Sequence, residues 1–583
     1  MHRPLALLTI LAVASGATAC GDFGGADSGA SSTDTTTASD VSGGDAFNGT
    51  QWQDPGTIPT SSADTVTYAD TASPSDTYQA AADTAMAPDT NQEPGPDTTT
   101  GEPEPEPIAT NPFVVASHDP LSTFGADVDT ASYEIFKKHV QELGQLPSPE
   151  SVRLEEFVNY FRYDYPIPDW EAERPFNVAV EAAPSAFSDT TLLRVGIQGK
   201  VVPPEVKPPA NLVFLVDVSG SMASPDKLEL VKVLLTQTLN VLDDDDTVAI
   251  VTYASQEKVV LPATPVAQRG LIEQKIAGLS ASGSTAGERG LQMAYEVAEE
   301  GWIEGGVNHV LLCTDGDFNV GISNTDDLVD FIADKRLSGI TLTVVGFGTG
   351  NLNDSMMEAV SNAGDGVYAY IGDADSAVAY ANNRMLGSIF FIAKDLKLQL
   401  AFNPATVYAY RLLGYESNAI ADHEFVDDTV DAGEIGSGHS VTALYELVLA
   451  GASVPAPAGA PLLDDGDDYV GEELPLFETD DIVEVRVRYK EPGATVDDPA
   501  IPIDYRVASH RIFESFGDAG DDLRWAAAVA AFAEILKGSP YADVANLDAI
   551  QTVVDEQEDS DVDRGEFSTL FTAARQLIEG PAD

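Results

Sequence analysis

The sequence predicts an α/β protein: a doubly wound, mostly parallel sheet beside a β-rich, sandwich-like domain and C-terminal helices. Three observations lead to this prediction. Uniformly apolar strands alternate with amphipathic helices between residues 211 and 386, strands with a period of two occupy residues 393–510, and a long segment poor in apolar residues precedes both. Apolar strands that alternate with helices indicate a parallel sheet covered on both faces.

The first 20 residues have the pattern of an export signal. A basic start at Arg3 is followed by an apolar core at residues 5–13 and by small residues up to Cys20. The core is too short for a membrane span. The segment resembles a bacterial lipoprotein signal, which implies that Cys20 is acylated and becomes the mature N-terminus. An ordinary secretory signal cleaved near Ala19 is the alternative.

The lipoprotein resemblance implies a location outside the cytoplasm. Two or three acyl chains would anchor the protein firmly to a bacterial membrane. Gly21 follows the cysteine, and in lipoproteins a residue other than Asp at this position favours the outer membrane. We therefore expect an extracytoplasmic, lipid-anchored protein.

Residues 21–112 are predicted to be a disordered acidic tether rich in Ser, Thr and Pro. No Lys or Arg occurs between Arg3 and Lys137, and such a composition cannot bury enough apolar surface to fold. A flexible chain of this length spans roughly 50–60 Å. The whole protein has a formal net charge of -65, which argues against a nucleic-acid partner because phosphates would repel it.

An N-terminal folded region is expected at residues 113–205. Helical spacing runs through residues 132–143 and 152–161, and two alternating strands follow at 176–181 and 192–197. A C-terminal region, residues 391–583, has alternating strands at 396–402, 407–413, 441–449 and 482–489, then helices at 521–537 and 566–579. We expect the two N-terminal strands to pack with the C-terminal ones in a β-sandwich.

The doubly wound domain is expected at residues 206–390. Its strands are predicted at 212–216, 247–253, 309–313, 341–346 and 366–371, and its helices at 227–242, 287–300, 325–337 and 354–362. Ligands of open α/β sheets bind beyond the carboxyl ends of the strands. Polar residues at those ends are therefore the candidate site.

Hard oxygen donors gather at this edge of the predicted sheet. Asp217, Ser219 and Ser221 follow the first strand, Asp315 follows the strand at 309–313, and Thr285 lies in a small-residue loop before a helix. Carboxylate and hydroxyl oxygens suit Mg²⁺, which prefers octahedral oxygen ligation and keeps several waters. The three loops can converge on one cation.

The order Asp-x-Ser-x-Ser, then Thr, then Asp resembles the metal-ion-dependent adhesion site of von Willebrand factor type A (VWA) domains, which have a Rossmann-like fold. The resemblance implies that Ser219, Ser221 and Thr285 offer hydroxyl oxygens to Mg²⁺ (or Mn²⁺). Asp217 and Asp315 would act largely through bound waters. An open coordination position would accept an acidic side chain from a partner protein.

The flanks resemble those of bacterial YfbK-like VWA lipoproteins. The matching segments are residues 122–133, 152–156, 159–161, 402–404, 410–415, 431–435 and 438–446. The resemblance therefore covers nearly everything after the tether. It identifies an architecture rather than a biochemical role.

An enzyme is not expected. The sequence has no Gly-x-Ser-x-Gly elbow, phosphate-binding Gly-Lys-Ser/Thr loop or His-Glu-x-x-His motif. His309 begins a strand and should lie at the sheet end opposite the serines, and Cys313 is interpreted as a buried, inert thiol. The favoured function is metal-dependent protein binding. The alternative is a structural or assembly factor of the cell envelope that binds through its β-rich flanks, with the metal only ordering loops.

Other acidic runs are interpreted as solvated. Asp317 and residues 243–246 are expected to be solvated loop acids. Residues 464–468 and 559–563 resemble calcium loops, but the second has Arg564 where such a loop needs glycine and Leu570 where a Glu should close it. We interpret both as turns.

Overall fold

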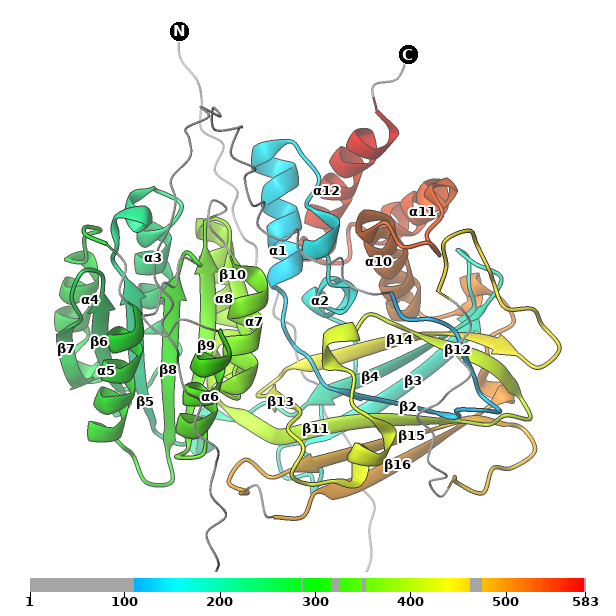
Figure 1. The fold of residues 1–583 in the computed structure, drawn as a ribbon, viewed down its shortest axis with the longest axis horizontal. Helices are drawn as coiled ribbons and strands as arrows, with labels where there is room; N and C mark the ends of the chain where they lie inside the picture. The colour runs from blue at the N-terminus through cyan, green and yellow to red at the C-terminus, as the bar shows by residue number, and fades with distance from the viewer. Residues whose placement is uncertain are drawn as a thin grey trace, which may run out of the picture. The chain divides into compact units, whose positions relative to one another are not determined.

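The computed structural model describes residues 110–284, 287–316, 325–348, 353–461, 474–495 and 498–580. The expected signal, Cys20 and nearly all of the expected tether lie outside these residues. Within them, residues 210–383 form a six-stranded sheet with helices on both faces, and the segments before and after it form a β-rich region and a group of helices (Figure 1).

The six-stranded sheet has the order β10-β9-β8-β5-β6-β7. Its parallel strands are β5 (Ala210–Asp217), β6 (Thr247–Tyr253), β8 (Val307–Thr314), β9 (Ile340–Phe347) and β10 (Tyr368–Ile371). These confirm the predicted doubly wound fold. The sequence interpretation missed β7 (Lys258–Pro265), which is antiparallel to β6. It carries Pro262 and Pro265, and edge strands tolerate proline because one side of the strand needs no ladder hydrogen bonds.

Helices cover both faces of this sheet. One face packs against α3 (Leu228–Thr238), α4 (Arg269–Ala277), α8 (Ala374–Asn383) and α9 (Met385–Ile389). The other packs against α5 (Gly287–Glu300), α6 (Thr325–Arg336) and α7 (Asp354–Ala363), together with α1 (Ala131–Lys138) from the N-terminal region. Burial on both faces explains why the central strands are apolar at almost every position.

The β-rich region consists of two sheets. One has the order β1-β12-β14-β4-β3, with β1 (Val114–Val115), β12 (Val407–Leu413), β14 (Ser440–Leu449), β4 (Thr191–Gly199) and β3 (Phe176–Pro184). The other has the order β13-β11-β15-β16, with β13 (Gly433–Gly436), β11 (Phe391–Phe402), β15 (Asp481–Lys490) and β16 (Ile501–Ala508), and β2 (Leu121–Gly125) also pairs with β11.

Apolar side chains of both sheets form one core, as in a sandwich. Strand β4 pairs with β14 over eight residue pairs, from Ser440 opposite Gln198 to Leu447 opposite Thr191. Of the two N-terminal strands, β4 thus joins a C-terminal strand directly, whereas β3 pairs with β4 at the sheet edge and shares the sandwich core, so the expected packing is confirmed.

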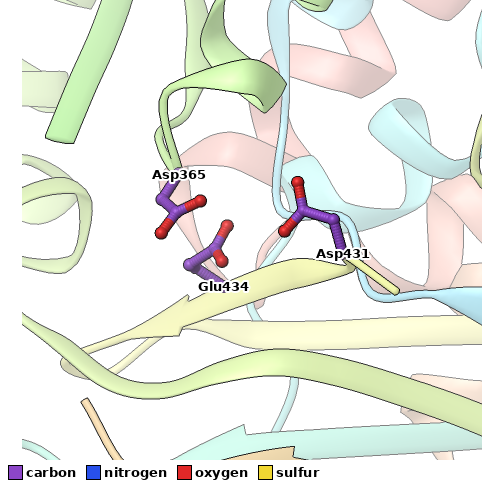
Figure 2. A group of neighbouring side chains, drawn as sticks. All are labelled: Asp365, Asp431 and Glu434. Atoms are coloured by element: carbon purple, nitrogen blue, oxygen red, sulfur yellow. The ribbon is translucent and has the colours of Figure 1, made fainter. Parts of the chain in front are cut away.

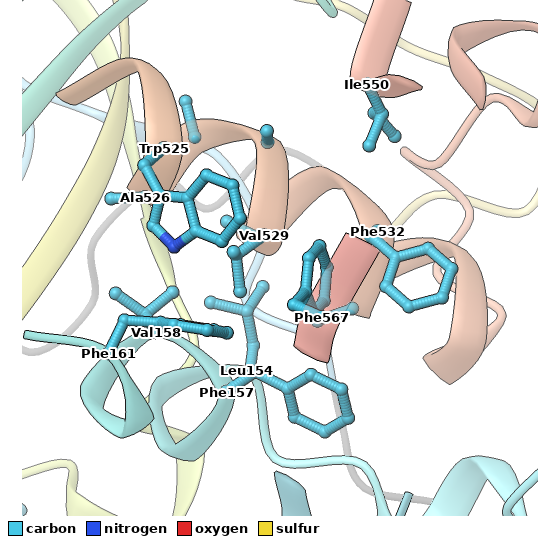
Figure 3. Close-up of a cluster of buried hydrophobic side chains, with 14 of the residues drawn as sticks. Leu154, Phe157, Val158, Phe161, Trp525, Ala526, Val529, Phe532, Ile550 and Phe567 are labelled. Atoms are coloured by element: carbon cyan, nitrogen blue, oxygen red, sulfur yellow. The ribbon is translucent and has the colours of Figure 1, made fainter. Parts of the chain in front are cut away.

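Four helices pack around a separate helical core, to which α1 also contributes Tyr133 and Phe136. They are α2 (Leu154–Tyr160), α10 (Asp521–Lys537), α11 (Leu547–Gln557) and α12 (Val562–Glu579). The fully buried Trp525 meets Phe161 and Phe567 edge to face, with ring centroids 5.2 and 5.4 Å apart (Figure 3). Helix α11 was not predicted, and α12 begins before the predicted residue 566. The Asp561 side chain caps α12 by accepting the Arg564 amide at 2.8 Å, so this acidic turn is a helix start.

The N-terminal region joins the central sheet through buried polar contacts. Asp129 Oδ1 accepts the Tyr368 amide of β10 at 2.8 Å, and Arg153 forms ion pairs with Asp354 and Glu358 of α7. Among the helices in the described ranges, none is long and apolar enough to cross a membrane.

Candidate metal site

The first loop of the candidate site follows β5. Asp217, the last residue of β5, is buried, and its Oδ1 accepts the Ser219 amide at 2.7 Å. This bond turns the chain into a short 3-10 helix, Gly220–Ala223. The turn places the Ser219 and Ser221 hydroxyl oxygens 2.8 Å apart. One carboxylate and two hydroxyls thus come from five consecutive residues.

A second loop lies against the first. The Gly220 amide donates to the Gly283 carbonyl at 2.9 Å, and the Ser282 amide donates to the Val218 carbonyl at 2.7 Å. Gly283 has φ of +93°, and a Cβ there would come within 2.5 Å of Ser255 Oγ, so only glycine fits. Thr285 itself lies outside the described residues. The residues just before it are held beside the Asp217 loop.

Asp315 comes to the same edge from β8. Strands β5 and β8 are parallel neighbours, with Val216 opposite Cys313, so both carboxylates follow adjacent strand ends. Asp315 is fully buried, and its Oδ2 accepts a hydrogen bond from Lys227 Nζ at 2.9 Å.

Sequence reasoning missed Lys227 as a site residue. It directly precedes α3, and its side chain passes Gly348, where a Cβ would lie 2.3 Å from Lys227 Cε. Gly348 also has φ of +75°, which favours glycine. No spacing in the sequence marks this lysine, because it reaches Asp315 only once β5, β8 and β9 are side by side.

The Asp217 carboxylate is incompletely satisfied. Burial raises its pKa to about 6, an effect that the hydrogen bonds from Ser219 oppose and the Asp315 charge reinforces. Its Oδ2 is buried and forms no hydrogen bond of standard geometry within the described part of the chain, and the neighbouring Tyr253 hydroxyl only partly opposes the rise in pKa. A buried carboxylate oxygen without a donor is costly. A divalent cation beside the hydroxyls of Ser219 and Ser221 would satisfy it, so the residues fit such an ion.

Other residues singled out in the sequence lie elsewhere. His309 is buried in the first half of β8, bonds Thr341 Oγ1 through Nδ1 at 2.7 Å, and has its pKa lowered to about 3 by burial. The expectation that it is remote from Ser219 and Ser221 is confirmed. Cys313 is buried and free, as expected, and burial raises the pKa of its thiol.

One acidic run was misinterpreted. Asp246 is buried instead of solvated: its carboxylate accepts the Ala210 amide at 2.7 Å, the Asp243 amide at 2.7 Å and Lys207 Nζ at 2.8 Å. A run of four aspartates gives no signal of this, because only the fold selects which one faces inward. Asp317 and residues 464–468 lie outside the described ranges.

Comparisons with known proteins agree with this architecture. Three family profiles match: von Willebrand factor type A domain at residues 211–383, the C-terminal region of uncharacterized protein YfbK at 387–577, and von Willebrand factor at 101–194. Uncharacterized protein YfbK of Escherichia coli is 36% identical over 483 residues, which cover 81% of this chain and 80% of that protein. This chain belongs to the YfbK-like family of VWA-domain proteins.

More distant relatives match a smaller share of this chain. Uncharacterized protein sll0103 of Synechocystis is 29% identical over 187 residues, 32% of this chain and 43% of that protein, so the match spans less than half of that relative. The solved structure of a von Willebrand factor type A protein from Catenulispora acidiphila has a TM-score of 0.39 and 16% identity, covering 71% of this chain and 91% of that one. The domain at residues 211–383 belongs to the VWA family, whose members often mediate protein–protein interaction.

Proposed function

We propose that this YfbK-like protein is a lipid-anchored, extracytoplasmic binding protein that engages a partner protein through Mg²⁺ (or Mn²⁺). The observation that carries the proposal is the oxygen cluster at the carboxyl end of β5 and β8. Asp217 Oδ2 is buried and forms no hydrogen bond of standard geometry within the described chain, beside two hydroxyls 2.8 Å apart and near a second buried carboxylate, Asp315. The metal and its partner are inferences from this cluster.

The ligand set follows from the chemistry of these residues. Ser219, Ser221 and Thr285 would supply neutral hydroxyl oxygens, and Asp217 and Asp315 would supply charge. A divalent ion held mostly by neutral oxygens stays electrophilic, which favours binding of an acidic side chain from the partner. Mg²⁺ and Mn²⁺ both accept such hard oxygen ligands.

Binding accounts for this site better than catalysis. A nucleophilic serine needs a base within hydrogen-bond reach. In the described chain, His309 is buried toward the other end of β8 and its pKa is lowered to about 3, so it does not serve Ser219 or Ser221.

The membrane anchor is proposed from the N-terminal sequence alone. Acylated Cys20 and the acidic segment after it would hold the folded region away from a bacterial membrane, with the outer membrane favoured. Labelling cells with a fatty-acid probe tests this. Label on the natural chain and none on Cys20→Ser is the expected result, and label on both would reject acylation at this residue.

The metal is tested by titration of the full chain with Mg²⁺ and Mn²⁺ in isothermal calorimetry. Asp217→Ala and Thr285→Ala should each weaken binding at least tenfold while circular dichroism stays unchanged. Asp245→Ala is the matched control, because Asp245 is exposed in a loop, and it should bind like the natural chain. Equal metal affinity in all four proteins would contradict the proposed site.

The partner is tested by capture from envelope extract with the natural chain and Asp217→Ala in parallel. Capture that depends on Mg²⁺, is lost with EDTA and is absent with Asp217→Ala supports the proposal. Capture by both proteins in EDTA would instead favour the alternative, a structural or assembly factor of the cell envelope that binds through its β-rich flanks.

A further inference from the structure

Three carboxylates meet where the central sheet contacts the β-rich region. Asp365 lies between α7 and β10, while Asp431 and Glu434 lie just before and within β13. One oxygen of each lies within 4.8 Å of the others, and the three side chains point toward one another (Figure 2). This acidic triad is far along the chain from Asp217 and lies near the start of β10, whereas the candidate metal site follows the strand ends.

Two basic side chains neutralise part of the triad. Arg336 donates to Asp365 Oδ1 at 3.0 Å and also to Asp431, and Lys394 Nζ donates to Asp365 Oδ2 at 2.8 Å. Three carboxylates therefore face two cations. Glu434 forms no ion pair with either of these residues within the described ranges.

The buried, incompletely satisfied carboxylate of Glu434 indicates that a ligand binds here. The residue is only 8% exposed, and its Oε1 is buried without a hydrogen-bond partner among the described residues. A buried carboxyl oxygen that accepts nothing is destabilising unless a cation or a donor reaches it.

The cavity beside the triad offers further oxygens. It has a volume of about 190 Å³ and is lined by Asp127, Asp129, Asn418, Asp431 and Glu434 among others, with no Lys, Arg or His among its lining residues. Asn418 Oδ1 is also buried without a hydrogen-bond partner in the described chain. Two residues that each carry an unsatisfied oxygen acceptor therefore line one cavity, which also has room for water ligands.

The spacing of the triad is compatible with calcium, and the mixed character of its ligands favours it. Two oxygens that bind one Ca²⁺ at about 2.4 Å are at most about 4.8 Å apart. The triad oxygens lie within the calcium limit as they stand. Ca²⁺ also accepts six to eight oxygens in irregular geometry, as a mixture of carboxylates, an amide oxygen and water requires.

We propose that Asp365, Asp431 and Glu434 form a second cation site, for Ca²⁺, that joins the VWA sheet to strand β13. Each oxygen of Asp365 already accepts one hydrogen bond from a basic side chain and keeps a further lone pair for the ion. The Lys394 ammonium therefore competes with the ion for the Asp365 carboxylate. Bound Ca²⁺ would hold together two segments that are 66 residues or more apart in the sequence.

The test separates this site from the one at Asp217. The full chain carrying Asp217→Ala is titrated with CaCl₂ in isothermal calorimetry after treatment with a chelator. One Ca²⁺ per chain is expected to remain. Adding Glu434→Gln should weaken that binding at least tenfold, because the change keeps the shape of the side chain and removes its charge. Asp427→Asn, at an exposed residue of the same segment, is the matched control and should bind unchanged.

Two further variants should change the Ca²⁺ affinity in opposite directions. Asp431→Asn, at a half-exposed side chain, should weaken Ca²⁺ binding even if Glu434→Gln folds poorly. Lys394→Met should tighten it several-fold, because the competing ammonium is gone. Absence of Ca²⁺ binding in the Asp217→Ala chain would overturn the proposal. Unchanged binding in both Glu434→Gln and Asp431→Asn would overturn it as well.

Discussion

Lys227 Nζ lies 2.9 Å from Asp315 Oδ2, and both side chains are buried at the carboxyl edge of the central sheet. The ammonium therefore neutralises one of the two carboxylates in the proposed Mg²⁺ site. A divalent ion near Asp315 must either share that carboxylate with Lys227 or displace it. We therefore expect this lysine to influence metal affinity, and no residue of the adhesion motif reveals that role.

Replacing Lys227 with methionine should raise Mg²⁺ affinity about tenfold, a change of about 1.4 kcal/mol. Methionine keeps the apolar stem that packs against Gly348 and removes the competing charge. Without metal, the same variant should be less stable by about 3 kcal/mol, because Asp315 then loses its buried cation. Calorimetric Mg²⁺ titration and urea unfolding, with and without Mg²⁺, measure the two effects.

Lys232→Met is the control for this prediction. Lys232 lies on α3, the helix that Lys227 precedes, and pairs with the exposed Glu229 at 2.7 Å, an arrangement that contributes little to stability. The Lys232→Met substitution should change neither the Mg²⁺ affinity nor the free energy of unfolding. A Lys227→Met chain that binds Mg²⁺ no more tightly than the natural chain would show that the ammonium and the ion do not compete.

The buried Glu155 should make stability depend on pH. Burial raises its pKa to about 8, and the charges of Glu416 and Asp127 add to the shift. In the unfolded chain the carboxyl ionises near pH 4.5, so between about pH 5 and 8 the folded state holds a proton that the unfolded state has lost. Its contribution to the free energy of unfolding is therefore full below pH 4.5 and falls as pH rises, by on the order of 1 kcal/mol per pH unit.

Glu155→Gln removes that contribution, because glutamine does not titrate. The stability of the variant relative to the natural chain should increase steadily from pH 5 to pH 8 in urea unfolding. Glu150→Gln, at a half-buried glutamate in the same region, is the control for the loss of one carboxylate there. A constant difference between Glu155→Gln and the natural chain across this range would contradict the raised pKa.

The helical core should be sensitive to truncation at Trp525. The ring is fully buried between Phe161 and Phe567, so Trp525→Ala should cost about 3–5 kcal/mol through lost burial and the cavity left behind. Val562→Ala, at a side chain that is 86% exposed on α12, should change stability by no more than about 0.5 kcal/mol. Urea unfolding measures both, and similar small losses would mean that α10 is not part of this core.

Among the four aspartates at residues 243–246, we expect Asp246 to be the one that stabilises the fold. Asp246→Ala removes the acceptor of two backbone amides and the partner of Lys207, at an expected cost of about 3 kcal/mol. Asp245→Ala, one residue away and exposed, should be close to neutral. Thermal unfolding of the two variants distinguishes them, and equal midpoints would restore the interpretation of a solvated run.

Much of the fold could be predicted because periodicity follows from burial. Strands buried on both faces are apolar throughout, as in β5, and sandwich strands such as β12 alternate in their sequence pattern. The elements that were missed have weak patterns. Strand β7 is an edge strand with two prolines, and α11 is a short helix whose apolar residues meet the helical core only in the tertiary structure.

The sequence by itself determined the α/β class, the positions of Asp217, Ser219, Ser221 and Asp315 at strand ends, and the family, because these depend on local order and spacing. Only the tertiary structure decided that Lys227 reaches Asp315, that Asp246 is buried, and that Asp365 meets Asp431 and Glu434. Such contacts join residues 36 to 88 positions apart with no shared period. They form when packed elements bring charged side chains together, and no local sequence pattern predicts contacts between residues so far apart in the chain.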